Sequence, residues 1–224
     1  MLTPVDSLED WLFKREDLFT YDCLNGTKAR FILDTLSKNR EIIRNYFNNT
    51  VKLKNNPTSH SYFSNQVICR NLGINLVNLL DREAYFNYLG FPMNQRAPFN
   101  ELFHYEEVIK QVANIPKNLD NFVISAGSCQ TLYAVLNGFL RYQNKPNRII
   151  VIGNKDPNPL CTKLISDLQV EFYNRKLREY PLVPCPIELD TVHELQAWSY
   201  LHTYISVEGS KLFWITGNYN FLRR

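Results

Sequence analysis

Glycine is scarce in this sequence. Its 224 residues include eight glycines, roughly half the number that average usage of about 7% would give. A glycine-poor chain is expected to keep glycine where backbone geometry or a close approach requires it. Glycines that fall inside a motif therefore deserve particular weight in this chain.

Long hydrophobic runs and a strong excess of one charge are also missing. No apolar stretch approaches the roughly 18 to 20 residues of a membrane span, and the first residues lack the basic and apolar regions of a signal peptide, so we expect no membrane partner. The 25 Lys and Arg residues exceed the 22 Asp and Glu residues by only three, which excludes a strongly basic nucleic-acid coat protein. Hydrophobic residues make up 45% of the chain, which excludes a disordered tail protein.

Paired cysteines and clustered histidines are absent. The cysteines are odd in number and never form a C-x-x-C pair; they are Cys23, Cys69, Cys129, Cys161 and Cys185. The histidines are dispersed at positions 60, 104, 193 and 202. Neither a disulfide scaffold nor a metal site is expected, and a reducing cytoplasm is the expected compartment.

What the sequence does contain is a regular alternation of helical and extended patterns. Helices are expected over 27–47, 59–72, 103–112, 132–140 and 190–204, and strands around residues 11–13 and over 51–53, 74–80, 121–125, 148–152 and 211–215. Strands that alternate with helices of this length predict an α/β fold with mainly parallel twisted sheets and flanking helices. Such sheets bind ligands at the carboxyl ends of their strands.

The sharpest local signal is the segment Ala126-Gly127-Ser128-Cys129-Gln130-Thr131, between a strand and a helix. A strand that turns directly into a helix presents free backbone N–H groups and a positive dipole end, which suit an anion. Alternatively, Ser128 simply caps the helix. The segment lacks the Gly-Lys-Ser/Thr of a Walker loop, and both interpretations stay open.

Two further helix starts carry polar side chains. Lys28 opens a helix, where a cation opposes the macrodipole, so it is either a solvated first-turn lysine or a residue that a ligand requires. Ser59, His60 and Ser61 open another helix. There, Ser59 is an ordinary N-cap or the group forms a cradle for a carboxylate.

Taken in order, these segments resemble the fold type II pyridoxal-phosphate enzymes, the tryptophan-synthase-β superfamily. The nearest branch is that of aminocyclopropane-carboxylate deaminase and D-cysteine desulfhydrase. That branch has a Lys-Arg-Glu-Asp segment before a Gly-Gly-Asn-Lys-x-Arg-Lys loop, a Ser-Asn helix start, a Gly-Ser-Gly-Gly-Thr phosphate loop and a late strand ending in Thr-Gly. The matching segments here are Lys14-Arg15-Glu16-Asp17, Asn25-Gly26-Thr27-Lys28-Ala29-Arg30, Ser59-His60, Gly127-Ser128-Cys129-Gln130-Thr131 and Thr216-Gly217.

The resemblance implies pyridoxal 5′-phosphate as cofactor, bound as an aldimine on Lys28, which is then the catalytic residue. It further implies that the cofactor is bound by His60, Thr216 and the loop residues Gly127, Ser128, Cys129, Gln130 and Thr131, with Thr216 facing the pyridine nitrogen. Ser59, His60 and Ser61 are then the substrate-binding residues. The chain departs from the family pattern at Cys129 and Gln130, which replace glycines, at His60, which replaces asparagine, and in being shorter.

The function that follows from the resemblance is a lyase or deaminase acting on a small amino acid or an amino-acid-like group. The whole chain, 1–224, is expected to form one such enzyme unit, a homodimer like its relatives, with about 50–115 as a smaller substrate-side subdomain inserted in the larger cofactor-binding one. Two alternatives stay open. One is a virus-encoded enzyme that acts in the host cytoplasm on an amino-acid-modified nucleotide in DNA, to which a net charge of +3 lends little support. The other is a non-catalytic descendant that binds a phosphorylated ligand.

Overall fold

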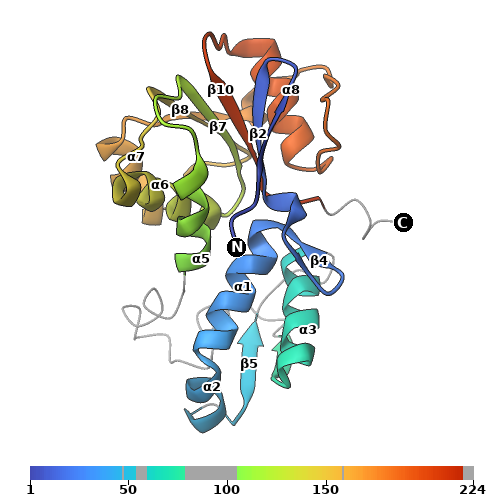
Figure 1. Cartoon of the computed structure of the whole chain (residues 1–224). Coiled ribbons are helices and arrows are strands. Elements are labelled where there is room, and N and C mark those ends of the chain that lie inside the picture. Colours follow the sequence, from blue (N-terminus) through green and yellow to red (C-terminus); the bar gives the residue numbers. More distant parts are fainter. Residues whose placement is uncertain (47, 54–59, 79–104, 158, 219–224) are drawn as a thin grey trace. The chain divides into compact units, whose positions relative to one another are not determined.

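The computed structural model describes residues 1–46, 48–53, 60–78, 105–157 and 159–218 (Figure 1). The chain divides into two compact units. The first takes in residues 1–20, 25–27 and 108 onward, and the second takes in residues 21–24 and 28–107. The expected substrate-side subdomain of about 50–115 stays a prediction.

A six-stranded sheet is the centre of the first unit. Its strand order is β1-β2-β10-β7-β8-β9. The strands are β1 (Val5–Leu8), β2 (Trp11–Arg15), β7 (Asn121–Ala126), β8 (Arg148–Gly153), β9 (Glu171–Asn174) and β10 (Lys211–Ile215). Every neighbouring pair is parallel except β1 and β2. The predicted α/β class with a mainly parallel sheet and flanking helices is therefore confirmed.

The central strands are apolar on both faces because helices cover both faces, as is usual in parallel sheets. All six residues of β7 are buried. Successive side chains of a strand point to opposite faces: Phe122 and Ile124 pack with Leu136 of one helix layer, whereas Val123 packs with Trp198 of the other.

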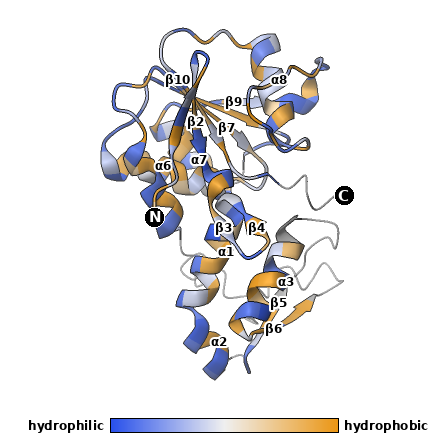
Figure 2. Ribbon diagram, turned by 45° about the vertical axis from the view of Figure 1, so that its right-hand side comes forward, coloured by the Kyte–Doolittle hydropathy of each residue, from blue (hydrophilic) through white to orange (hydrophobic). Residues whose placement is uncertain are grey.

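Helices α6 and α7 cover one face of this sheet, and α8 lies on the other (Figure 1). The helices of the first unit are α6 (Gln130–Tyr142), α7 (Pro159–Asp167) and α8 (Glu194–Tyr204). The short helix α5 (Glu106–Ile109) leads from the second unit into the first. The 3-10 turns are η1 (Glu16–Leu18), η4 (Lys110–Asn114) and η5 (Arg175–Leu177). Figure 2 shows mainly hydrophobic or neutral colours along the strands of the sheet, while the helices alternate between hydrophilic and hydrophobic residues. This pattern is typical of a buried sheet between amphipathic helices.

The second unit is built on helices and a small parallel sheet. Its elements are α1 (Gly26–Lys38, the first two residues belonging to the first unit), α2 (Arg40–Tyr46), β5 (Thr50–Leu53), α3 (His60–Leu72) and β6 (Asn75–Asn78). β5 and β6 pair in parallel with Val51 opposite Leu76. A two-residue ladder of β3 (Thr20–Tyr21) and β4 (Leu24–Asn25) precedes α1.

Most predicted elements are present, and the differences have physical causes. Helix α8 begins at Glu194 rather than at 190, because Asp190 Oδ1 accepts hydrogen bonds from the backbone N–H groups of Val192 and His193 and holds a turn there. β1, β3, β4, α7 and β9 were not predicted from the sequence, and the helix predicted over 27–47 is two helices, α1 and α2. No helix within the described part of the chain is long and apolar enough to cross a membrane.

Candidate functional site

Three of the predicted motifs meet at one edge of the first unit's sheet. β7 and β10 are neighbours and run parallel, so the loop after β7 and the Thr216-Gly217 segment after β10 leave the same carboxyl edge. The segment Asn25-Gly26-Thr27 lies at the same edge, because it is hydrogen-bonded directly to residues 216–218. This is the edge at which parallel α/β sheets bind ligands.

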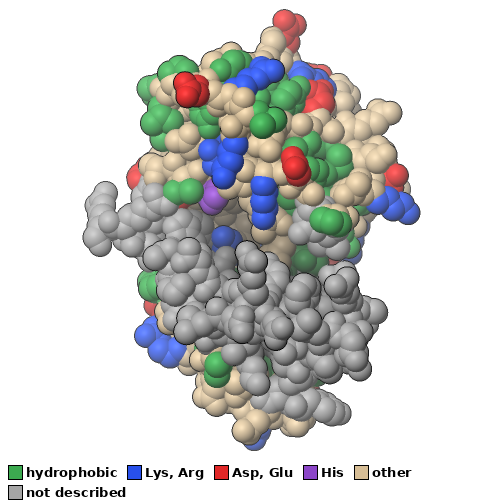
Figure 3. All heavy atoms as spheres, turned by 180° about the vertical axis from the view of Figure 1, so that it is seen from behind, with side chains coloured by type: hydrophobic (Ala, Val, Ile, Leu, Met, Phe, Trp, Pro, Cys, Tyr) green, Lys and Arg blue, Asp and Glu red, His purple; other side chains and the backbone are tan. Residues whose placement is uncertain are grey.

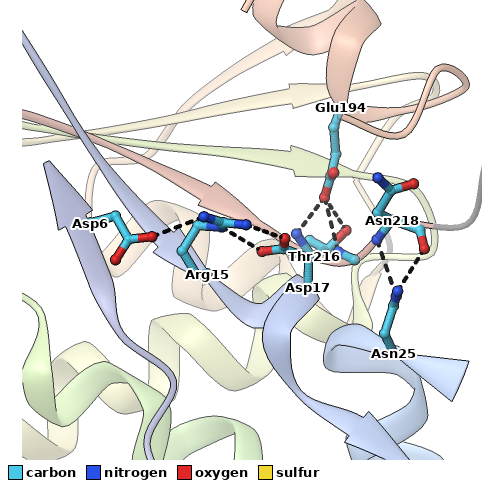
Figure 4. A network of polar contacts seen from close by, with 8 residues as sticks. Asp6, Arg15, Asp17, Asn25, Glu194, Thr216 and Asn218 are labelled. Atoms are coloured by element: carbon cyan, nitrogen blue, oxygen red, sulfur yellow. Dashed lines mark hydrogen bonds and ion pairs between the residues drawn. The ribbon is translucent and has the colours of Figure 1, made fainter. Parts of the chain in front are cut away.

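Segments 25–27 and 216–218 are tied together in register. Thr27 N donates to the Thr216 carbonyl at 2.6 Å. Asn25 Nδ2 donates to the Asn218 carbonyl at 2.8 Å, and the Asn218 N–H returns a hydrogen bond to Asn25 Oδ1 at 3.1 Å (Figure 4). These hydrogen bonds hold two segments that are far apart in the sequence side by side at the sheet edge.

Gly26 makes this close approach possible. Its φ of +83° lies in the left-handed region. A Cβ at this position would overlap the Thr216 carbonyl oxygen and stand 2.6 Å from Gly217 Cα. No other residue fits there without moving the chain, which is what the scarcity of glycine suggested.

Glu194 holds the segment Thr216-Gly217 in place through hydrogen bonds. It is fully buried at the start of α8, and its Oε1 accepts hydrogen bonds from the Thr216 hydroxyl at 2.6 Å, from the Thr216 N–H and from the Gly217 N–H at 3.3 Å (Figure 4). Its second oxygen, Oε2, is buried and has no hydrogen-bond partner among the described residues. The Thr27 hydroxyl is likewise buried and lacks a partner within the described part of the chain.

The environment of Glu194 favours its protonated form. Burial raises the pKa of the Glu194 carboxyl to about 8, against the lowering effect of the hydrogen bonds from Thr216 and Gly217. Below that pH the carboxyl is neutral, and the oxygen without a partner, Oε2, is the place for its proton. A strongly shifted carboxyl at a sheet edge is a common mark of a functional site.

The loop after β7 leads into the N-terminus of α6 and adjoins open space. Ser128 is exposed and Cys129, not Ser128, is the N-cap of α6, with no side-chain capping bond. The interpretation of Ser128 as a simple helix cap is therefore wrong. A Cβ at Gly127 would meet no heavy atom within 4 Å, so open space adjoins the loop. The Cys129 side chain is 3% exposed and lies in the hydrophobic core, away from that space.

The Lys-Arg-Glu-Asp segment lies beside this site and holds the sheet edge together. Arg15 bridges Asp6 at 2.9 Å and Asp17 at 2.7 Å (Figure 4). Lys14 is fully buried, and its Nζ donates to the Thr3 carbonyl and to Asn114 Oδ1, both at 2.7 Å. These residues stabilise the fold around the site.

The remaining predicted residues lie at the starts of α1, α6 and α3. Lys28 follows Thr27 in α1 and is half-buried. Gln130 and Thr131 are half-buried in the first turn of α6. His60 and Ser61 begin α3; their side chains and Ser59 lie outside the described residues, so the substrate cradle stays a prediction.

The fold is shared with a solved enzyme. The chain is similar to the processed form of threonine deaminase isoform 2 from Solanum lycopersicum, with a TM-score of 0.54 and 13% sequence identity, over 95% of this chain and 77% of that one. At this identity the likeness shows the fold. No protein-family model matches the chain, and no curated protein sequence matches it.

Two residues of the site had no signal in the sequence. Glu194 stands in the first turn of a helix, where acidic residues are common because they favour the macrodipole. Cys161 Sγ lies 3.3 Å from the Cys129 carbonyl, inside a helix that was not predicted. Only the packing of α7 and α8 against the sheet reveals that both residues reach the site.

Proposed function

We propose that this protein is a pyridoxal-phosphate-dependent lyase or deaminase acting on a small amino acid or an amino-acid-like group, with Lys28 as the residue that carries the cofactor. The observation that carries the proposal is the convergence of Gly26-Thr27, Thr216-Gly217 and the Gly127 loop at one sheet edge. A threonine deaminase has the same fold, and the lyase or deaminase class agrees with that neighbour.

The residues present fit this cofactor. The loop of Gly127, Ser128, Cys129, Gln130 and Thr131 offers open space beside Gly127, hydroxyl donors and the N-terminus of a 13-residue helix for a phosphate. The two glycine replacements are compatible with it, because the Cys129 side chain is buried in the core and Gln130 is only half-buried. Thr216 would hold the pyridine nitrogen, and His60 would complete the proposed set.

Each group of this chain has a definite chemical part. When bound, the cofactor supplies an electron sink for charge that develops on the substrate. The Lys28 amine holds the cofactor and then moves a proton to or from the substrate. Because the Thr216 hydroxyl donates to Glu194, it could only accept a hydrogen bond from a bound ring. The pKa of Glu194, raised to about 8, keeps its carboxyl protonated at lower pH. Ser59, His60 and Ser61 would receive the substrate carboxylate.

The experiment that tests this proposal is reconstitution with excess pyridoxal phosphate. The wild-type protein should turn yellow and absorb in the visible, and Lys28→Ala should lose that band while keeping its circular dichroism spectrum. Lys38→Ala, at the other end of α1, is the matched control and should keep the band. A colourless reconstituted wild type contradicts the proposal.

Two alternatives are ranked lower. An amino-acid-modified nucleotide in DNA would call for a basic surface, but on the face seen in Figure 3 the Lys and Arg side chains lie scattered among acidic, hydrophobic and other side chains. A non-catalytic phosphate-ligand protein would keep the Gly127 loop and make no covalent use of Lys28. We further propose a homodimer in the cytoplasm, of the host if the chain is virus-encoded.

A further inference from the structure

The Gly127 loop contains a strained residue that the resemblance does not account for. Cys129 stands where the family has glycine and adopts φ 64° and ψ 7°, the left-handed region that disfavours residues with a Cβ. Such a conformation persists only where the surroundings hold it in place.

The carbonyl group of Cys129 is held by two donors. The Tyr133 N–H donates to it at 2.9 Å, as the first turn of α6 requires, and Cys161 Sγ lies 3.3 Å from the same oxygen. Cys161 is fully buried on α7 and packs in the same core cluster as Cys129. A hydrogen bond with the Cys129 side chain and burial raise the pKa of the Cys161 thiol. The thiol therefore stays protonated, and its S–H is the donor.

The direction of this carbonyl decides the direction of the next N–H. A trans peptide is planar, so the carbonyl of Cys129 and the N–H of Gln130 point in opposite directions. Because the carbonyl points toward donors in α6 and α7, the Gln130 N–H points away from Cys161. Gln130 is the first residue of α6, so its N–H has no acceptor within the helix and is available to an anion.

We propose that Cys161 is a positioning residue of the anion-binding loop. By donating to the Cys129 carbonyl, it fixes the left-handed residue and the direction in which the Gln130 N–H meets a phosphate group. This inference rests on the proposed function, since the phosphate is that of the cofactor. It also accounts for the loss of a loop glycine: the hydrogen bond from α7 takes over the support that a left-handed Cys129 needs.

The test uses inorganic phosphate and pyridoxal phosphate as separate probes, titrated into the wild type, Cys161→Ala and Cys161→Ser. Alanine and serine differ by one hydroxyl, so the pair separates the donated hydrogen bond from loss of the sulfur's packing. Cys161→Ala should bind both probes about threefold to tenfold more weakly, as expected for one lost hydrogen bond. Cys161→Ser should bind like the wild type. Cys69→Ala, a buried cysteine of the second unit, is the matched control and should leave both affinities unchanged.

A spectroscopic readout accompanies the affinities. The Gln130 amide resonance should shift on phosphate saturation in the wild type and in Cys161→Ser, and should shift less in Cys161→Ala. A merely structural role for Cys161 would lower stability in both variants and leave the phosphate-dependent shift of Gln130 the same.

The outcomes separate this inference from the proposed function. Equal affinities in the wild type and Cys161→Ala, or no rescue in Cys161→Ser, overturn the positioning role and leave the cofactor assignment standing. Phosphate binding that depends on Cys161, in a protein that gives no visible band with pyridoxal phosphate, supports the positioning role and overturns the cofactor assignment. A wild type that binds neither probe overturns both.

Discussion

At the scale of single residues, Glu194 has the most unusual environment. It is a fully buried carboxyl with one oxygen shared by three donors and the other without a partner among the described residues. A buried carboxyl in this state is stable only while it is protonated. Loss of this proton should therefore lower the free energy of unfolding of the first unit.

Glu194→Gln should remove a pH dependence of folding. The pKa of Glu194 is about 8 in the folded protein against an ordinary value of 4.5, so the folded state binds the proton more tightly than the unfolded state. This contribution to the free energy of unfolding is complete below pH 4.5 and is lost as the pH rises toward 8. Between pH 5 and pH 8 we expect the wild type to lose about 1 to 3 kcal/mol more than Glu194→Gln does.

Urea unfolding at pH 5, 6.5 and 8 measures this difference. Glu171→Gln is a suitable control, because hydrogen bonding to Arg148 lowers the pKa of Glu171. That variant should lose stability by a similar amount at all three pH values. Parallel curves for the wild type and Glu194→Gln would show that Glu194 is ionised throughout.

At the scale of elements, the junction of the segment before α1 with the end of β10 has the least tolerance for change. Gly26→Ala places a methyl group against the Thr216 carbonyl and forces φ +83° on a residue with a Cβ. We expect a loss of about 2 kcal/mol or more in the free energy of unfolding. Chemical denaturation of the apo protein gives the value.

Gly73→Ala separates the two causes of that loss. Gly73 has φ +66°, and a Cβ there would meet nothing within 4 Å. This variant should cost only about 1 kcal/mol, from the backbone conformation alone. Equal losses in the two variants would mean that a Cβ at position 26 does not clash with the Thr216 carbonyl oxygen.

The buried lysine of β2 supports a second junction, between the N-terminal segment and η4. Lys14→Met keeps the length of the side chain and removes the donor to the Thr3 carbonyl and Asn114 Oδ1. One buried and one half-buried acceptor then lose a charged donor, and we expect the free energy of unfolding to fall by about 1 to 3 kcal/mol. Lys211→Met breaks a pair with the exposed Asp10 and should lower stability much less than Lys14→Met does. Thermal unfolding of the two variants in parallel distinguishes these cases.

The sequence predicted the strands that are buried on both faces, because burial on both faces gives a continuous apolar run. β7, β8 and β10 are buried on both faces, so their apolar runs identify them. β9 is half-buried along its length and contains Glu171 and Asn174, so it has no such pattern. The start of α7 carries Pro159, and its burial depends on α6, which local periodicity cannot show.

At the scale of the whole molecule, the same distinction applies to the site. The Gly127 loop, Gly26 and Thr216 were predictable because each is a local motif at the end of a strand or the start of a helix. The contacts of Glu194 and Cys161 were not, because they depend on which helix packs over the sheet edge. The predicted α/β fold agrees with that of a threonine deaminase over 95% of this chain.

The most direct test of the account is to find where pyridoxal phosphate becomes attached. The reconstituted wild-type protein is reduced with borohydride, digested and mapped by mass spectrometry. The account predicts a single phosphopyridoxyl group, on the peptide that contains Lys28, and no such group on that peptide in Lys28→Ala. Attachment at another lysine, or none in a protein saturated with the cofactor, would contradict the central claim.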